Sequence, residues 1–247
     1  MRHRPRSCAI IRAATYNIRK SVGLDWMRKP ARILDVLGEI EADVIALQEV
    51  DRRFGTRTST LTAEALDEAG WHYRSVSDAA PSLGWHGNAI IASKKVEIEA
   101  VVPITLPAFE PRGAVAALLR FNGVAFAAIG LHLGLLGRHR DQQISAILGY
   151  ADQELKRPTI IMGDTNEWRG KAAGFARIAQ SHIVVPPMPT FHTSLPVLAL
   201  DRIIVTPEFE PVAHGVHASA LAKRASDHLP LWADLVLKNP GSEVAPP

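Results

Sequence analysis

The sequence predicts a layered α/β fold in which some of the strands pair antiparallel. Short apolar runs that end in polar residues recur along the 247 residues, interleaved with helical patterns. Several strand-like runs follow one another without a helix between them, which a strict alternation of strand and helix would not produce. Asn122 and Gly123, which lie between two such runs, form a hairpin turn signal.

The first half of the chain predicts two helices among several strands. Ile33, Val36, Leu37 and Ile40 have the i, i+3, i+4, i+7 spacing of an amphipathic helix. Residues 62–69 predict a second helix, which Gly70 ends. The strand-like runs are residues 8–17, 43–48, 72–76, 89–93, 96–103, 114–121 and 124–132.

The second half begins with the longest predicted helix, residues 138–155, because helical apolar spacing continues from Ile144 to Leu155. Residues 181–199, rich in Pro, Thr and His, predict an irregular loop. A further helix is expected over residues 170–179, and strands over 158–162, 200–206 and 231–237. No repeat or composition shift marks a boundary, so we expect one domain over residues 1–247 with flexible ends at about 1–7 and 239–247.

Composition and charge are those of an ordinary globular protein, with 47% apolar and 21% charged residues. The net charge of +3 attracts anions only weakly, because no long Lys or Arg run lies inside the chain. The one cysteine, Cys8, excludes an intrachain disulfide and gives no sign of a cysteine-based metal site. No run reaches the length of a membrane helix, about 20 apolar residues, and the N-terminus lacks the apolar core of a secretory signal. We therefore expect a cytoplasmic protein.

The first candidate site is the segment GDTN, which follows the apolar run 159–162. Asp164 and Asn166, two residues apart at the end of a strand, can point into one cleft. The carboxylate could bind a hard cation or hold an attacking water, and the amide could donate to a phosphate oxygen. An Asx-rich turn that merely ends the strand is the alternative.

Further candidates also lie at the ends of predicted strands. Asp227 and His228 are adjacent, as a metal ligand beside a general base would be, or as in a solvated loop. Glu49 follows a buried run and suits Mg²⁺ or Mn²⁺, or it could pair with Arg52 or Arg53. Asn17 ends the first run and has the same two readings, metal ligand or turn.

Three more candidates depend on their neighbours. His132, in GLHLG, follows an apolar run and is either a core histidine or a catalytic one. Asp201 could fix the tautomer of an imidazole and stabilise its charged form, or pair with Arg202. Arg112 precedes Gly113, which allows close backbone approach, so this arginine could contact phosphate or simply lie at the surface.

Seven segments lie in order over about residues 13–237, namely TYNIR, LQEVD, GNAIIAS, GLHLG, GDTNEW, LDRIIV and SDHLPL. Together they resemble the endonuclease/exonuclease/phosphatase superfamily of DNase I-like, metal-dependent phosphoesterases. The resemblance implies a four-layer α/β sandwich, in which two mixed, mainly antiparallel sheets pack face to face with helices outside. It also implies in-line attack of water on phosphorus, assisted by Mg²⁺ or Mn²⁺.

The resemblance implies roles for five of the candidates at the metal and the water. Glu49 would be the main metal ligand, with Asn17 and Asp227 nearby. Asp164 would orient or deprotonate the attacking water, and Asn166 would hold a phosphate oxygen.

The remaining roles concern the phosphate and the leaving group. His228, oriented by Asp201, would contact and activate the phosphate. His132 would help the leaving group, and Arg112 would bind phosphate. DNase-like members carry a second Glu that partners the first histidine, whereas residues 71–87 here contain no Glu and a single acid, Asp78.

The predicted function is a divalent-metal-dependent hydrolase of phosphate esters, a phosphodiesterase or phosphatase acting on a small or lipid-like substrate. The missing Glu and the lack of a long basic insertion favour such a substrate over duplex DNA. A DNA or RNA endo- or exonuclease is one alternative, and a catalytically inactive module that binds a phosphate ligand is another. We expect a monomer whose partner is its phosphate-ester substrate, nucleic acid being the alternative, and no integral membrane segment.

Overall fold

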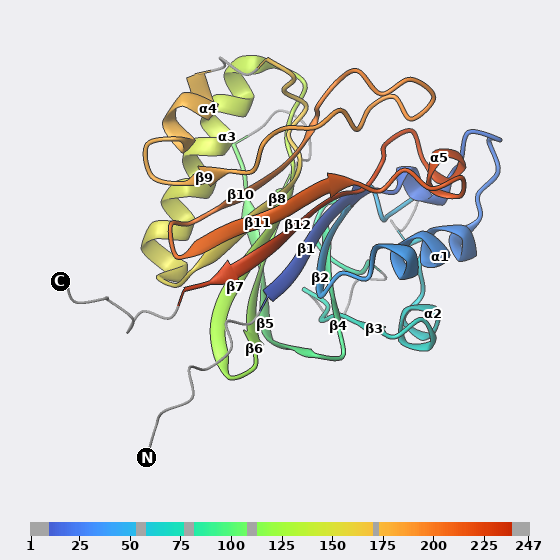
Figure 1. The fold of residues 1–247 in the computed structure, drawn as a ribbon, viewed down its shortest axis with the longest axis horizontal. Helices are drawn as coiled ribbons and strands as arrows, with labels where there is room; N and C mark the ends of the chain where they lie inside the picture. The colour runs from blue at the N-terminus through green and yellow to red at the C-terminus, as the bar shows by residue number, and fades with distance from the viewer. Residues whose placement is uncertain (1–9, 53–57, 77–81, 108–112, 170–172, 239–247) are drawn as a thin grey trace.

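Two sheets and two sets of helices make up the part of the chain that the structure describes. The structure is a computed structural model, and it describes residues 10–52, 58–76, 82–107, 113–169 and 173–238. Within these ranges two six-stranded sheets pack face to face, and helices cover their outer faces (Figure 1). The predicted four-layer α/β sandwich is therefore confirmed.

The first sheet has the strand order β11-β12-β1-β2-β4-β3. Only β1 and β2 are parallel; its other pairs are antiparallel. Its strands are β1 (Ile10–Asn17), β2 (Val44–Gln48), β3 (Trp71–His72), β4 (Ala89–Ser93), β11 (Phe209–Val216) and β12 (Leu231–Leu237). Its outer face packs against α1 (Pro30–Ile40), α2 (Ala63–Glu68) and α5 (Ala222–Ala225).

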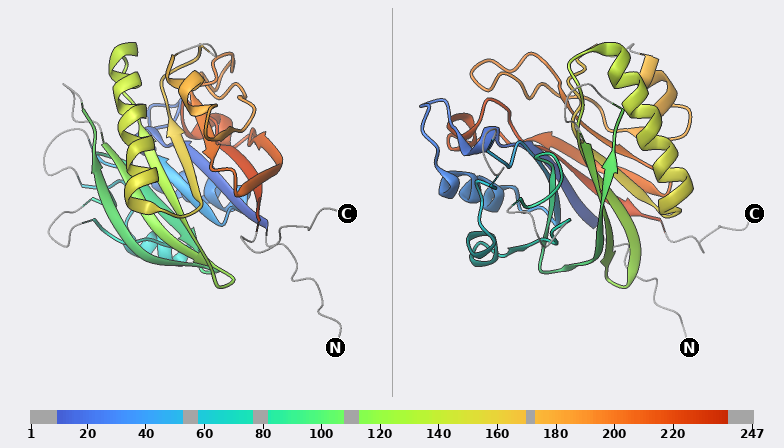
Figure 2. Two further views of the ribbon diagram at one scale, coloured as in Figure 1. Left: turned by 90° about the vertical axis from the view of Figure 1, so that its left-hand side faces the viewer. Right: turned by 180° about the vertical axis from the view of Figure 1, so that it is seen from behind.

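The second sheet has the order β5-β6-β7-β8-β10-β9, and again only the central pair, β7 and β8, is parallel. Its strands are β5 (Val96–Thr105), β6 (Gly113–Phe121), β7 (Val124–His132), β8 (Thr159–Asp164), β9 (Ile183–Val184) and β10 (Asp201–Val205). Its outer face is covered by α3 (Gly137–Tyr150), which continues into a π-helical turn (Ala151–Leu155), and by α4 (Ala173–Ile178). Figure 2 shows these helices on the side opposite α1 and α2.

The core between the sheets explains why the central strands are continuous apolar runs. In β1, Ala13 faces the second sheet while Ala14 faces the helices, so both faces of the strand are buried. Phe126 of β7 and Phe209 of β11 meet edge to face across the two sheets, with ring centroids 6.1 Å apart. Both rings are fully buried, and burying each contributes roughly 1.5–3 kcal/mol.

Most predicted elements are confirmed. The helices predicted around residues 33–40, 62–69 and 138–155 are present, and the hairpin turn has φ of 50° at Asn122 and 82° at Gly123. No helix in the described ranges is both long and apolar enough to cross a membrane. The predicted flexible ends lie outside the described residues.

One predicted strand was too long, and the strands β9 and β11 were not predicted. Strand β9 lies within residues 181–199, which were predicted to form an irregular loop. The strand predicted over residues 72–76 consists of Trp71 and His72 alone, because the ladder with β4 pairs only these two residues. Strand β11 was missed because Pro211 and Gly215 interrupt its pattern. Proline is tolerated here, since β11 is an edge strand with an irregular register next to Pro211.

Candidate active site

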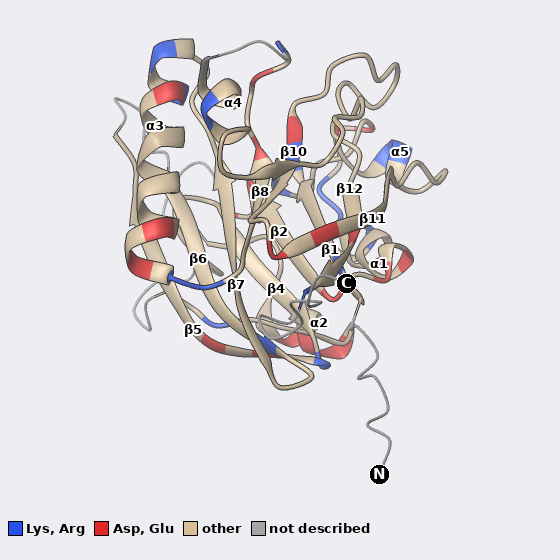
Figure 3. Cartoon of the chain, turned by 60° about the vertical axis from the view of Figure 1, so that its left-hand side comes forward, with Lys and Arg blue, Asp and Glu red and all other residues tan. Residues whose placement is uncertain are grey.

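The predicted site residues come from both sheets and meet at one end of the sandwich. Asn17 ends β1, Glu49 follows β2, and Asp227 and His228 precede β12 in the first sheet. In the second sheet His132 and Asp164 end the parallel strands β7 and β8 and lie at the same level. Asp201 begins β10, which is antiparallel to β8, so it too lies level with Asp164. Figure 3 shows acidic residues, in red, where β8 ends and β10 begins.

Asp164 is the centre of the cluster. Its Oδ2 accepts a hydrogen bond of 3.1 Å from Asn17 Nδ2, which bridges the two sheets. The same oxygen lies 3.4 Å from His132 Nε2 and 3.7 Å from His228 Nε2. Burial raises the pKa of this carboxyl, but the two imidazoles hold it below its usual value. Asp164 is therefore a buried anion placed between two histidines.

Gly163 makes this placement possible. Strands β7 and β8 approach so closely here that a Cβ on Gly163 would lie 2.0 Å from the carbonyl oxygen of Leu131. Only glycine fits this contact, and it brings His132 and Asp164 side by side.

His228 is held by a buried carboxylate. Its Nδ1 lies 2.9 Å from Oδ2 of Asp201, which also accepts a 2.6 Å hydrogen bond from the Thr190 hydroxyl. Phe191 packs against the imidazole with ring centroids 4.9 Å apart. Burial lowers the pKa of His228, but the charge and hydrogen bond of Asp201, with the charge of Asp164, raise it to about 10. This imidazole is cationic at neutral pH, with Nε2 on the Asp164 side.

Asn166 is fixed by the turn that follows β8. Its backbone is left-handed, with φ of 50°, and its N–H donates to Oδ1 of Asp164 over 3.0 Å. Its Nδ2 donates to the carbonyl oxygen of Leu133 over 2.9 Å. The side-chain amide has a second hydrogen, so it can still donate to a phosphate oxygen.

Two basic residues that sequence reasoning missed lie against the predicted metal ligands. Lys20 Nζ contacts the carboxylate of Glu49, and Arg19 Nε lies 3.4 Å from Oδ2 of Asp227. Burial raises the pKa of Glu49, but Lys20 brings it below the usual value. The signal was present in the sequence, because both residues follow Asn17 in the same segment, TYNIRK.

The turn that carries these residues has an unusual backbone. Arg19, Lys20 and Ser21 have φ of 46°, 55° and 60°, all in the left-handed region that costs non-glycine residues about 1–2 kcal/mol each. The N–H of Lys20 donates to the carbonyl oxygen of Glu49 over 2.9 Å, which ties the turn to the end of β2. Such backbone outliers concentrate at functional sites.

A hard divalent cation fits the donor set of the candidate site. Asn17, Glu49 and Asp227 offer only oxygen ligands, and Mg²⁺ typically uses one or two carboxylates with water and substrate phosphate. Within the described ranges, no group of three or more His, Cys, Asp or Glu side chains could by itself hold a metal ion. The donors therefore suit a cation that shares its coordination with water and substrate.

A second network of buried hydrogen bonds, from Arg140 of α3 and Arg202 of β10, holds the GDTNEW segment. Glu167 accepts a 2.6 Å hydrogen bond from Arg140 Nη2, and its backbone carbonyl accepts one of 3.1 Å from Arg202 Nη2. The alternative pairing of Asp201 with Arg202 side chains is not seen, since Arg202 donates to backbone carbonyls and packs over Phe175. Asp201 is left to hold His228.

The surroundings of Arg112 can be described only from its neighbour. Arg112 and Asp78 lie outside the described residues, so the phosphate contact predicted for Arg112 stays a prediction. The space at Gly113 is taken by the indole of Trp85, which would lie 2.6 Å from an added Cβ. Asn88 donates to the carbonyl oxygen of Gly113 over 2.9 Å and thereby ties the residue before β4 to the start of β6.

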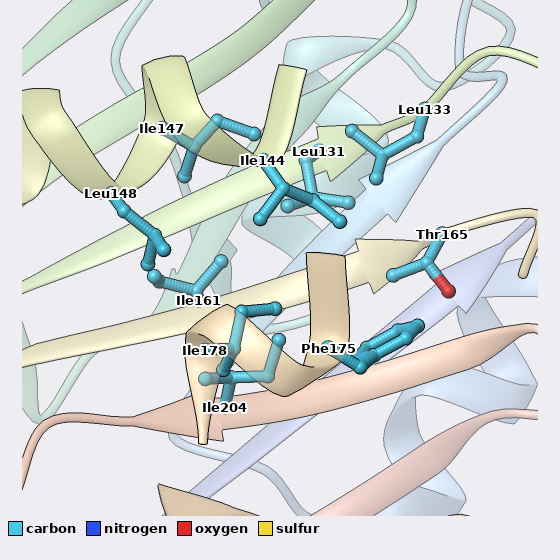
Figure 4. A pocket seen from close by; sticks show the side chains of 10 residues that line it. All are labelled: Leu131, Leu133, Ile144, Ile147, Leu148, Ile161, Thr165, Phe175, Ile178 and Ile204. Atoms are coloured by element: carbon cyan, nitrogen blue, oxygen red, sulfur yellow. The ribbon is translucent and has the colours of Figure 1, made fainter. Parts of the chain in front are cut away.

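The enclosed pocket shown in Figure 4 is not the candidate site. It lies between α3, α4 and the second sheet and is lined almost entirely by apolar side chains such as Ile144, Ile161 and Phe175. Its volume of about 10 Å³ barely admits one water molecule. It is a packing gap in the core.

Comparison with known proteins gives the family. A model of the Endonuclease/Exonuclease/phosphatase family matches residues 14–228. The chain belongs to this family. The predicted resemblance is confirmed, and membership of the Endonuclease/Exonuclease/phosphatase family supports a phosphoester hydrolase in general. No match was found among curated proteins.

Solved structures share the fold of this family member at low sequence identity. An endonuclease/exonuclease/phosphatase from Bacteroides vulgatus is 18% identical, with a TM-score of 0.72 over 93% of this chain and 100% of the other. A mannosyl-6-phosphatase from Bacteroides thetaiotaomicron is 17% identical, with a TM-score of 0.69 over 92% and 100%. D. rerio TDP2 complexed with single-strand DNA product is 17% identical, with a TM-score of 0.71 over 92% and 99%.

Proposed function

We propose that this chain is a divalent-metal-dependent hydrolase that directs water at the phosphorus of a small or lipid-like phosphate ester. The observation that carries the proposal is the position of Asp164 between His132 and His228, 3.4 and 3.7 Å from their Nε2 atoms. Phosphoryl transfer needs a positioned water, positive charge at the nonbridging oxygens and help for the leaving oxygen. The cleft offers groups suited to each task.

Asp164 would position the attacking water. Its lowered pKa keeps the carboxylate ionised, so it accepts a hydrogen bond from water readily but is a weak base at rest. Its main contribution is therefore to hold the water in line with the phosphorus, and it takes the proton as the water oxygen bonds to phosphorus.

His228 would face the phosphate as a cation. Its pKa of about 10 keeps Nε2 protonated at neutral pH, and Nδ1 is engaged by Asp201. A charged donor fixed in advance stabilises the growing charge on a phosphate oxygen without reorganisation. Asn166 would add a neutral donor, and His132 would protonate the leaving oxygen.

The cation would be held by Asn17, Glu49 and Asp227, and when bound it would supply positive charge to the phosphate oxygens. Lys20 and Arg19 already balance the charges of Glu49 and Asp227. We expect these two basic side chains to move toward substrate phosphate when the carboxylates bind the cation.

The substrate class is supported by solved structures that share the fold more than by the geometry of the candidate site. The Bacteroides thetaiotaomicron relative in fold is named a mannosyl-6-phosphatase, a phosphatase by name. The D. rerio structure with single-strand DNA product favours a nuclease as the second candidate.

A panel of phosphate esters with Mg²⁺ or Mn²⁺ tests the proposal. We expect release of product from bis-p-nitrophenyl phosphate or from a lysophospholipid, and none without divalent cation. Nicking of supercoiled plasmid or of an abasic duplex, with the other substrates untouched, would instead establish a nuclease. Binding of a phosphorylated ligand without any hydrolysis would show an inactive binding module.

A further inference from the structure

Exposed apolar side chains are concentrated around the cleft. Eleven large hydrophobic residues are exposed in the described part of the chain, and seven of them lie in loops at the end of the sandwich where the candidate site lies. We call these seven the apolar rim: Trp26, Met27, Leu135, Leu136, Trp168, Leu195 and Val197. Exposed apolar residues scattered singly need no explanation, but a group of them around one site does.

The topology brings the rim together. Trp26 and Met27 follow β1, Leu135 and Leu136 follow β7, and Trp168 follows β8. Leu195 and Val197 precede β10, whose antiparallel pairing with β8 places its start beside the end of β8. In Figure 1 the loops before β10 and after β1 extend beyond the sheets at the same end.

Two contact chains join the rim to the catalytic side chains. The guanidinium of Arg19 lies 4.7 Å from the ring centroid of Trp26 and also pairs with Asp227. On the other side, the N–H of Val197 donates to the carbonyl oxygen of Phe191, whose ring packs on His228. These contacts place Trp26 and Val197 next to the candidate site, one on each side. Trp26 and Leu195 are 79% and 73% exposed, so they project into solvent there.

The same loops carry an excess of positive charge. Residues 19–29, 133–138, 165–169 and 190–199 contain six Lys and Arg and two acids, Asp25 and Glu167. Both acids are neutralised by arginines outside these loops, Asp25 by Arg32 over 2.8 Å and Glu167 by Arg140 over 2.6 Å. Four of the six cations also lie in ion pairs, namely Arg19, Lys20, Lys29 and Arg169. Since six cations face two acids, the loops still have a net positive charge beside the apolar side chains. Figure 3 shows further Lys and Arg on the neighbouring α5.

We propose that the apolar rim docks the protein on an anionic phospholipid surface, with the candidate site facing the headgroups. Apolar side chains inserted at the headgroup boundary and cations beside them are what interfacial binding requires. Five of the seven rim residues are aliphatic, and aliphatic side chains cannot stack on bases as a single-strand nucleic-acid platform requires. The inference rests on the proposed function for the identity of the substrate, a phosphate ester presented at a lipid surface.

Vesicle binding in the presence of EDTA tests the surface separately from catalysis. We expect the full chain to sediment with vesicles of phosphatidylcholine and phosphatidylglycerol, and much less with phosphatidylcholine alone. Binding should weaken as salt is raised. The double variant Trp26→Ser with Leu195→Ser should bind at least about tenfold more weakly, since binding scales with inserted apolar area. Its thermal unfolding midpoint, measured in parallel, should match the wild type.

A matched control uses exposed apolar residues elsewhere. Val102 and Val212 lie on strands β5 and β11, and the variant Val102→Ser with Val212→Ser should bind vesicles like the wild type. Equal loss in both double variants, or no binding by the wild type, would overturn the proposal. So would binding of a single-stranded oligonucleotide that depends on Trp26 while vesicles are ignored.

Failure of this inference and failure of the proposed function give different results. Hydrolysis of soluble esters without vesicle binding rejects the docking surface alone. Vesicle binding without hydrolysis of any phosphate ester rejects the proposed activity alone. Asp164→Asn should bind vesicles as the wild type does.

Discussion

Asp201 and His228 form a buried pair in which Oδ2 of the carboxylate lies 2.9 Å from Nδ1 of the imidazole. The two residues are 27 positions apart, and the second oxygen of Asp201, Oδ1, has no hydrogen-bond partner within the described ranges. An ionised carboxylate in this position fixes the imidazole tautomer and favours its charged form. Burial lowers the pKa of His228, and Asp201 makes the largest of the contributions that raise it to about 10.

Asp201→Asn is expected to reduce turnover by roughly 10²–10⁴-fold, as loss of a positioned acid or base typically does. Burial alone lowers the pKa of His228, so removing the carboxylate should bring this pKa well below about 10. The mechanism needs the imidazolium of His228, which is populated only at pH below its pKa. The variant should therefore lose activity as pH rises through neutrality, while the wild type keeps it. A pH–rate profile measures this difference. Identical profiles would show that Asp201 does not control the charge of His228.

Asp164→Asn and His228→Ala should each lower turnover by about 10²–10⁴-fold while the fold survives. The asparagine keeps the size of Asp164 but loses the charge that lies between His132 and His228. Its one carbonyl oxygen can accept from Asn17 or from Asn166 but not from both. Turnover on bis-p-nitrophenyl phosphate is the readout, with circular dichroism and thermal unfolding as controls for folding. Near-wild-type turnover in either variant would contradict the mechanism.

Glu49→Gln should chiefly raise the Mg²⁺ or Mn²⁺ concentration needed for half-maximal activity. A neutral amide binds a hard cation less strongly than a carboxylate, and Glu49 directly follows β2 at the candidate cation site. Titrating activity against metal concentration measures the shift. Glu64→Gln, an exposed residue of α2, serves as the matched control and should leave the metal requirement unchanged. An unshifted requirement in Glu49→Gln would exclude its ligand role.

Glu167→Gln should destabilise the fold by about 3–5 kcal/mol, because Arg140 would stay buried without a counter-charge. Burial raises the pKa of Glu167, but hydrogen bonds from Arg169 and Arg140 lower it from 4.5 to about 2. A carboxyl group whose pKa is lower in the folded state than in the unfolded state stabilises the fold at pH values above its unfolded pKa. The difference from wild type should therefore be constant above about pH 5 and shrink as pH falls toward 2.

Urea denaturation at several pH values measures this difference. Glu210→Gln is the matched control, since Glu210 pairs with Lys238 in an exposed position and its loss should matter little. Equal effects of the two substitutions would show that burial of the Glu167 pair does not contribute.

Much of the site was predictable because its residues lie at the ends of strands. Each candidate follows or precedes an apolar run, and side chains at adjacent strand ends converge in a layered α/β fold. Strands β4 and β7 have the predicted bounds because their apolar runs end abruptly in polar residues. The edge strand β11 was not predictable in this way, since Pro211 is acceptable only because one side of the strand has no partner.

The sequence by itself determined the layered fold, the order of its elements and the family, because periodicity and motif order are written along the chain. Which residues touch was decided by the tertiary structure. Asn17 reaches Asp164 across 147 positions because the two sheets pack together, and Arg140 reaches Glu167 across 27 because α3 packs on the second sheet. Packing of the two sheets decides that Asp201 pairs with His228 instead of Arg202, and the parallel pairing of β1 with β2 places Lys20 on Glu49. The physical reason is that a buried charge loses its interactions with water. It is then stabilised by a partner that lies close to it in the folded structure, wherever that partner lies in the sequence.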